Sequence, residues 1–238
     1  MTLQLVRDPI LEKIQKHFEH LDIQSSISNE KLDFESGYLD SYLMEGKDGI
    51  CTAGSLRFHN SSIDYLHLIK KQEYAKCDFA VGGYVGMGIH LHSWWKMRFM
   101  LSFPTPLKLG PFDMGTITTI KKGLLHSEVE SFVWSGYPKL TTLPPGLVRD
   151  NVAEALDSNR ILTKLMMKHL LKERTIIVSR FSPTQTGLSA KKTGSIVKIE
   201  PQWKLQKDLF IDKDTLSMYE MLAGTIKTVI NSLKYHLQ

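Results

Sequence analysis

The segment from Asp78 to Phe103 constrains the fold more than any other part of this chain, because its residues alternate in character. Odd positions from Phe79 to Phe103 are mostly apolar, whereas even positions from Ala80 to Ser102 are mostly small or polar. Alternation with a period of two is the pattern of a β-strand that buries one face. We therefore expect two strands here, over 78–92 and 94–103, joined by a turn near Ser93.

The same period continues on both sides of this segment and predicts a protein rich in strands. Glycine, asparagine, aspartate and proline separate the alternating stretches, as they do between the strands of a meander. Further strands are expected at 37–44, 54–59, 63–69, 115–121, 124–134, 175–181, 194–199 and 203–209. Because neighbouring strands follow one another directly, the sheet should be mainly antiparallel.

Helical spacing of apolar residues is found in three regions. An N-terminal helix should have Asp8 as its cap and Pro9 in its first turn. A mid-chain helical segment should contain one helix over 150–156 and a second over 158–172, capped by Ser158. A long C-terminal helix should begin after Asp212 or Asp214. Together with the strands, these helices predict the α+β class.

The run Pro144-Pro145-Gly146 interrupts both periodic patterns and is the best candidate for an internal boundary. The chain of 238 residues is long enough for one domain or for two small lobes. We expect a single domain over 1–238, or a β-rich lobe over 1–143 and an α+β lobe over 147–238.

Glycines recur at even positions of the alternating segment, and glycine inside a strand marks a close approach of another group to the backbone. A helix of the same chain could fill that space, and so could a ligand or a partner. The even positions also carry aromatic and basic residues, which suits a binding face. The candidate ligand-binding residues are Gly82, Tyr84, Gly86, Gly88, Trp94 and Arg98.

His90 and His92 are two positions apart on one strand, which is a spacing that places two imidazoles side by side. His126 and Glu128, on another expected strand, could complete a set that suits zinc or iron with one position open for water. This pattern indicates a metal-dependent hydrolase or lyase. Two histidines on a solvated strand are the alternative interpretation.

Charge and cysteine content narrow the classes of partner and compartment. The formal net charge is +5, divided into −2 over residues 1–119 and +7 over residues 120–238. A basic C-terminal half can attract nucleic acid or another anionic partner. Two cysteines and an N-terminus without an uninterrupted apolar core favour a cytoplasmic protein. The longest uncharged run, 79–95, contains four glycines and two histidines, so we expect no membrane span.

Three short stretches between residues 117 and 171 occur in a recognisable order. They are Lys122-Gly123-Leu124-Leu125, Ser135-Gly136-Tyr137-Pro138 and Asp150-Asn151, and two short helices are expected after them. In this order, about residues 117–171 resemble a group of uncharacterised prokaryotic α+β domains of unknown function. The resemblance implies an α+β module and gives no activity, because none is established for the group.

Three hypotheses about function stay open from the sequence. The first is a non-enzymatic α+β module that binds a protein partner or a small ligand. The second is the metal-dependent enzyme described above, and the third is a nucleic-acid-binding protein that uses the basic half. The C-terminal helix has a wide apolar stripe, which could also serve oligomerisation.

Overall fold

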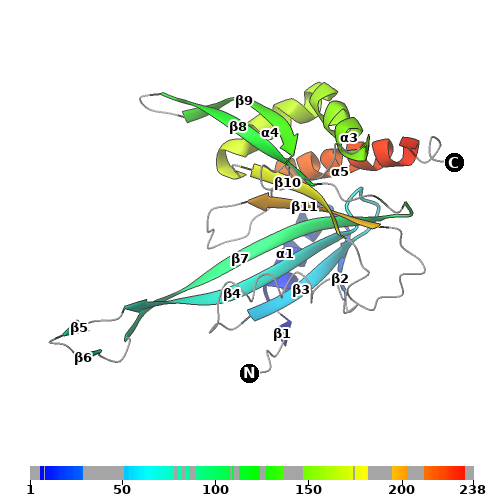
Figure 1. The fold of residues 1–238 in the computed structure, drawn as a ribbon. Helices are drawn as coiled ribbons and strands as arrows, with labels where there is room; N and C mark the ends of the chain where they lie inside the picture. The colour runs from blue at the N-terminus through cyan, green and yellow to red at the C-terminus, as the bar shows by residue number, and fades with distance from the viewer. Residues whose placement is uncertain are drawn as a thin grey trace.

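The computed structural model describes residues 6–7, 9–28, 51–77, 80–81, 84–85, 89–107, 109, 113–123, 127–136, 147–173, 175–181, 195–202 and 212–233. Within these residues the chain has the α+β fold that the sequence predicts (Figure 1). Nine strands form one sheet in the order β1-β3-β4-β7-β11-β10-β8-β9, with β2 paired to β3. All pairs are antiparallel except β1 with β3.

The strands of this sheet are β1 (Val6–Arg7), β2 (Ser25–Ser28), β3 (Cys51–Phe58), β4 (Tyr65–Cys77), β7 (Ile89–Thr105), β8 (Asp113–Lys122), β9 (Ser127–Gly136), β10 (Thr175–Phe181) and β11 (Ser195–Gln202). The short strands β5 (Ala80–Val81) and β6 (Tyr84–Val85) pair with each other at the far end of the long β4–β7 hairpin (Figure 1).

Four helices are described: α1 (Ile10–His20), α3 (Leu147–Ser158), α4 (Arg160–Glu173) and α5 (Lys213–Leu233). The helix α1 contacts β2 and β3, whereas α3, α4 and α5 gather beside β8–β11 (Figure 1). Their buried side chains belong to one apolar core together with those of the strands. We call the side of the sheet that meets this core the helix face, and the opposite side the outer face.

One row of apolar side chains crosses six strands on the helix face. Each member is the cross-strand neighbour of the next, and all are at most 1% exposed. The row consists of Leu56, Leu66, Leu101, Ile199, Val178 and Met114. Because directly opposite residues of antiparallel strands share a face, this row fixes which positions of each strand face the helices.

The helix α1 packs closely against β3 because a glycine leaves room for it. The spacing of Leu11, Ile14 and Phe18 places all three on the buried side of α1. Gly54 of β3 lies under Leu11, and a Cβ built on Gly54 would be 2.1 Å from Leu11 Cδ1. This glycine is therefore required by a close approach of a helix to the sheet.

The C-terminal helix α5 connects the last part of the chain to the first half of the sheet. The rings of Tyr219 and Phe99 are perpendicular, with centroids 6.4 Å apart. Lys227 Nζ lies 2.9 Å from Asp64 Oδ2 and 4.9 Å from the ring centroid of Phe103. The long C-terminal helix predicted from the sequence therefore packs its stripe of buried residues into the core.

Two local expectations from the sequence are wrong. The chain does not turn near Ser93, because β7 continues from Ile89 to Thr105 and pairs with β4 along most of that length. No glycine or proline lies between Ile89 and Phe103 to end the strand. The helix α4 is capped by Asn159, whose Oδ1 accepts a hydrogen bond from Leu162 N at 3.1 Å, while Ser158 ends α3.

The expected strands at 37–44 and 203–209 lie outside the described residues. In the described part of the chain, no helix has the length and apolar character that a membrane crossing requires.

Candidate functional site

Three of the predicted ligand-binding residues belong to described strands. Trp94 and Arg98 are in β7, at register positions opposite Glu73 and Ile69 of β4. Tyr84 is in β6. Gly82, Gly86 and Gly88 lie outside the described residues.

The structure does not bring the described members of the predicted metal set together. His90 and His92 are in β7, opposite Lys76 and Ala75, whereas Glu128 is an exposed residue of β9. Three strands, β11, β10 and β8, separate β7 from β9. At about 4.8 Å per strand, the lateral separation is roughly 19 Å. His126 lies outside the described residues, and among those that are described no three His, Cys, Asp or Glu side chains form a metal-binding group.

A row of polar residues crosses the outer face and runs beside the apolar row of the helix face. Its members are cross-strand neighbours over six strands: Arg57, Tyr65, Ser102, Lys198, Ser179 and Asp113. Ser102 and Ser179 are buried, whereas Tyr65, Lys198 and Asp113 are partly exposed. The outer face is therefore polar near its middle, in contrast to the helix face.

Asp113 stands at one end of this polar row in an environment that disfavours its charge. Burial is the largest influence and raises the pKa of the Asp113 carboxyl above its ordinary value. Lys198 acts in the opposite direction and Glu200 in the same direction, so the two charges partly cancel. The backbone N–H of Met114 also favours the charged form, but burial outweighs it together with Lys198.

A second polar group lies in the middle of the outer face, between β3, β4 and β7. His67 is 3% exposed, and its Nδ1 and Nε2 lie 2.7 Å and 2.8 Å from the hydroxyls of Ser55 and Ser102. A neutral imidazole carries one N–H, so it donates to one serine and accepts from the other. Burial lowers the pKa of His67 to about 3. His67 is thus a neutral structural link between three strands rather than a base near neutral pH.

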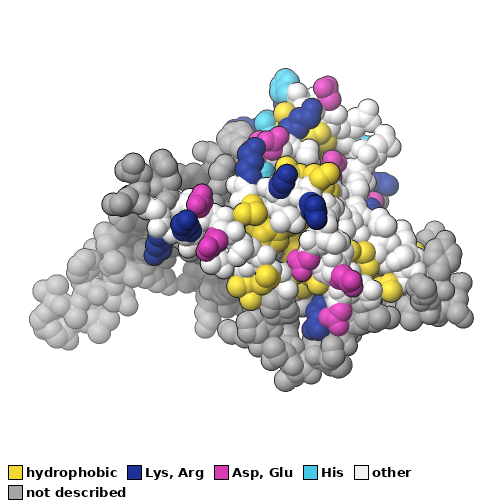
Figure 2. Space-filling view, turned by 90° about the horizontal axis from the view of Figure 1, so that it is seen from above, with side chains coloured by type: hydrophobic (Ala, Val, Ile, Leu, Met, Phe, Trp, Pro, Cys, Tyr) yellow, Lys and Arg dark blue, Asp and Glu magenta, His cyan; other side chains and the backbone are white. Residues whose placement is uncertain are grey.

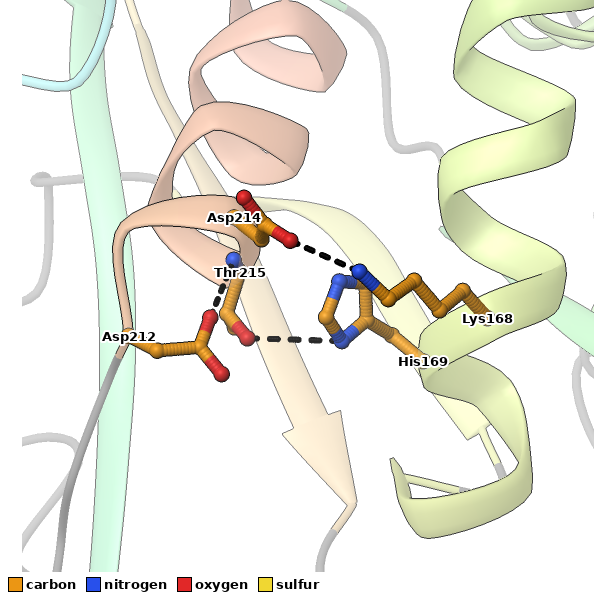
Figure 3. A network of polar contacts seen from close by, with 5 residues as sticks. All are labelled: Lys168, His169, Asp212, Asp214 and Thr215. Carbon is orange, nitrogen blue, oxygen red and sulfur yellow. Dashed lines mark hydrogen bonds and ion pairs between the residues drawn. The ribbon is translucent and has the colours of Figure 1, made fainter.

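The ends of α4 and α5 meet in a third polar network (Figure 3). Lys168 Nζ lies 2.7 Å from Asp214 Oδ2, and this hydrogen bond raises the pKa of the Lys168 ammonium. Asp212 Oδ1 accepts a hydrogen bond from Thr215 N at 2.7 Å, which makes Asp212 the N-cap of α5. Thr215 Oγ1 also lies 3.3 Å from His169 Nδ1. These contacts cap the first turn of α5 and join it to the last turns of α4, so we assign the network a structural role.

Replacement of Asp212 by alanine should lower the free energy of unfolding by about 1 kcal/mol, because the first turn of α5 loses its cap. Urea denaturation measures this change. Asp212→Asn is the matched control and should keep most of the stability, since an asparagine oxygen also accepts the hydrogen bond from Thr215 N. Equal losses in both variants would show that the charge of Asp212, and not its capping bond, stabilises the helix.

Most of the described large apolar side chains that are exposed lie on the hairpin β8–β9 at the end of the sheet. Among the described residues, four large apolar side chains are exposed, and three of them belong to this hairpin. They are Ile117 at 53%, Val133 at 54% and Ile120 at 39%, whereas Ile161 of α4 is exposed at 65%. Ile117 and Val133 are directly opposite each other on the outer face. We call these two residues the apolar pair.

Polar residues follow the apolar pair along the same hairpin. Thr119 faces Ser131, and beyond a bulge Lys121 faces Glu128, all four of them exposed. Seen from the side of β9 and the helices α3 and α4, exposed hydrophobic side chains form small patches between charged ones (Figure 2). The hairpin therefore presents an apolar centre beside hydroxyl and charged groups.

The sequence of the β8–β9 hairpin contains a pattern that indicates the apolar pair. In both strands of the hairpin, apolar residues occur at odd and at even positions, as Ile117 and Ile120 show in β8 and Val133 and Trp134 show in β9. Val129 and Trp134 are buried in the core, so Val133 is left for the other face. An apolar residue on each face of a strand is the pattern that indicates a second contact surface.

Comparison with models of known protein families, with curated proteins and with solved structures found no match to this chain.

Proposed function

We propose that this protein is a non-enzymatic binding module that holds a protein partner on the outer face of the β8–β9 hairpin. The observation that supports the proposal is the apolar pair, Ile117 and Val133, each more than half exposed on neighbouring strands. Exposed apolar side chains that occur singly need no explanation, whereas adjacent ones on an ordered strand pair are typical of contact surfaces.

The residues around the apolar pair suit a partner that is itself a folded protein. Protein interfaces have an apolar centre that excludes water and a rim of polar groups that form hydrogen bonds. Thr119 and Ser131 can supply such hydrogen bonds, and Lys121 and Glu128 can supply charge on the same side of the hairpin. The expected partner presents one or two apolar side chains that are bordered by hydroxyl or amide groups.

The chemistry of the described ionisable groups supports binding more than acid–base catalysis. The most shifted group, His67, is neutral down to a pH of about 3 and is buried between two serine hydroxyls. A general base at neutral pH needs both access to its substrate and a pKa near 7. We also propose a cytoplasmic location, because the chain has only two cysteines.

Replacement of Ile117 by lysine should reduce partner capture at least about tenfold, because a charge would be buried at the centre of the contact. The measurement is affinity capture from a cytosolic extract, followed by titration of the purified partner against the wild-type protein. Ile161→Lys is the matched control, since it changes the other highly exposed isoleucine, which lies on α4.

The proposal requires a partner whose affinity falls with Ile117→Lys and is unchanged with Ile161→Lys. Both sites are exposed, so neither variant should unfold the protein, and urea denaturation checks this. Partners that bind the Ile117 variant as tightly as the wild type would contradict the proposal.

A further inference from the structure

The strand β9 is at the end of the sheet and offers a second place for contact beside the outer face. It pairs with β8 on one side, and within the described residues no strand pairs with its other side. Ser131 and Val133 are both exposed there. An edge of this kind presents backbone N–H and C=O groups that another extended strand can pair with.

We infer that this edge binds the β9 strand of a second copy of the chain, in antiparallel orientation, with Val133 at the two-fold axis. The inference rests on the proposed function and names the partner as a second copy of this chain. A two-fold axis places the same patch on both subunits, so the strand must be compatible with itself. The apolar pair and the charges of β9 allow this compatibility to be tested register by register.

The axis at Val133 is the register that extends the apolar pair across the interface. Val133 of one copy then lies opposite Val133 of the other, and each has Ile117 of its own copy on its other side. The result is a row of four apolar side chains over four neighbouring strands. Phe132 lies opposite Trp134 in this register, and Ser131 lies opposite Ser135, so residues of similar polarity meet.

Neighbouring registers place unlike residues together. With the axis at Phe132, Val133 lies opposite Ser131 and Glu130 lies opposite Trp134. With the axis at Val129, Glu128 of one copy lies opposite Glu130 of the other, and like charges directly opposite each other are destabilising. Of these three registers, the one with its axis at Val133 pairs residues of like polarity and keeps the acidic residues apart.

The acidic residues of β9 define where the pairing stops. Thr119 pairs with Ser131 and Ile120 with Val129, so Glu130 is the extra residue of a bulge that interrupts the regular strand. The paired segment then runs from Ser131 to Ser135, which is a common strand length. With the axis at Val133, the Glu130 side chains of the two copies are about 20 Å apart at opposite ends of the segment. At that distance physiological salt screens their repulsion, because the Debye length is about 8 Å.

Disulfide trapping tests the register directly. The full chain is used with its two cysteines, Cys51 and Cys77, replaced by serine. Val133→Cys should form a disulfide-linked dimer under mild oxidation, because residues opposite each other on paired strands have Cβ atoms about 5 Å apart. Ser131→Cys alone should not form one, because each Ser131 is four residues from its symmetry mate along the strands. Thr119→Cys, one strand inside the edge, is the second control.

Sedimentation of the protein with native cysteines over a range of concentrations provides the independent measurement. The wild-type chain should show a monomer–dimer equilibrium, and Val133→Lys should raise the dissociation constant at least about tenfold. Ile161→Lys should leave the constant unchanged. Trapping at Val133 but not at Ser131 or Thr119, together with this shift, supports the inference.

Two outcomes overturn the inference. A wild-type chain that stays monomeric at the highest concentration refutes self-association, and equal trapping at all three cysteine positions refutes the register. Capture of a different protein that depends on Ile117 would then leave the proposed function standing. A monomeric chain that also lacks any Ile117-dependent partner would refute both.

Discussion

Lowering the pH from 7 to 4 is expected to reduce the free energy of unfolding by about 3 kcal/mol through His67 alone. Burial between β3, β4 and β7 lowers the pKa of His67 to about 3, whereas the ordinary value is 6.5. Above pH 6.5 the imidazole is neutral in both states. Below pH 6.5 the unfolded chain binds a proton that the folded chain does not bind until about pH 3, so stability falls through that window.

Urea denaturation at several pH values between 7 and 4 measures this effect. His67→Gln removes the titrating group, so its loss of stability with falling pH should be smaller than that of the wild type by about the same 3 kcal/mol. Met100→Leu is the matched control, because Met100 lies directly opposite His67 and does not titrate. This control should shift stability by a constant amount. A pH dependence that is unchanged in His67→Gln would show that another group causes it.

The second large effect is expected at the contact between α1 and β3. Gly54→Ala should destabilise the protein by about 2 kcal/mol, because the new methyl group would overlap Leu11, which is fully buried. Leu11→Ala should cost about 3 kcal/mol through the cavity that it leaves. In the double variant the methyl group added to the Gly54 backbone occupies part of that cavity, so the loss should be smaller than the sum by about 1–2 kcal/mol.

Chemical denaturation of the two single variants and the double variant completes this cycle. Gly224→Ala is the control for a glycine without a tight core contact, because its added Cβ would meet only the Ser62 hydroxyl, at 3.1 Å. That hydroxyl can rotate, so the change should be within about 1 kcal/mol. Additive losses for Gly54 and Leu11 would mean that the helix moves away from the sheet instead of meeting the new side chain.

The sequence predicts well the elements whose signals are local. The buried stripe of α1 follows from Leu11, Ile14 and Phe18, and that of α5 follows from a similar spacing that ends at Leu233. Asp212 and Asp214 are the two residues predicted to begin α5, and Asp212 caps that helix. Each of these features depends on residues within a few positions of one another, so a single sequence contains the information.

Features that depend on distant pairing could not be predicted in the same way. Nothing in the residues near Leu101 indicates that Ile199 is its neighbour, although the two are adjacent in the sheet. His67 has the ordinary pattern of a strand residue. The two serines that hydrogen-bond its buried ring lie on other strands, β3 and β7. The distance of Glu128 from His90 and His92 has the same cause, because the order of strands places β9 and β7 far apart.

The position of β7 has a consequence for how the chain reaches its native state. β7 pairs with β4 on one side and with β11 on the other. Within the described sheet it therefore joins the strands β1, β3 and β4 to the strands β11, β10, β8 and β9. Its partner residues on β11 lie roughly 100 positions later, and α5, which packs against Phe99, comes later still. Contacts between such distant residues form slowly, because long loops must close first. During synthesis on the ribosome, Phe99, Leu101 and Phe103 therefore cannot complete their native contacts until residues 195–233 have been made.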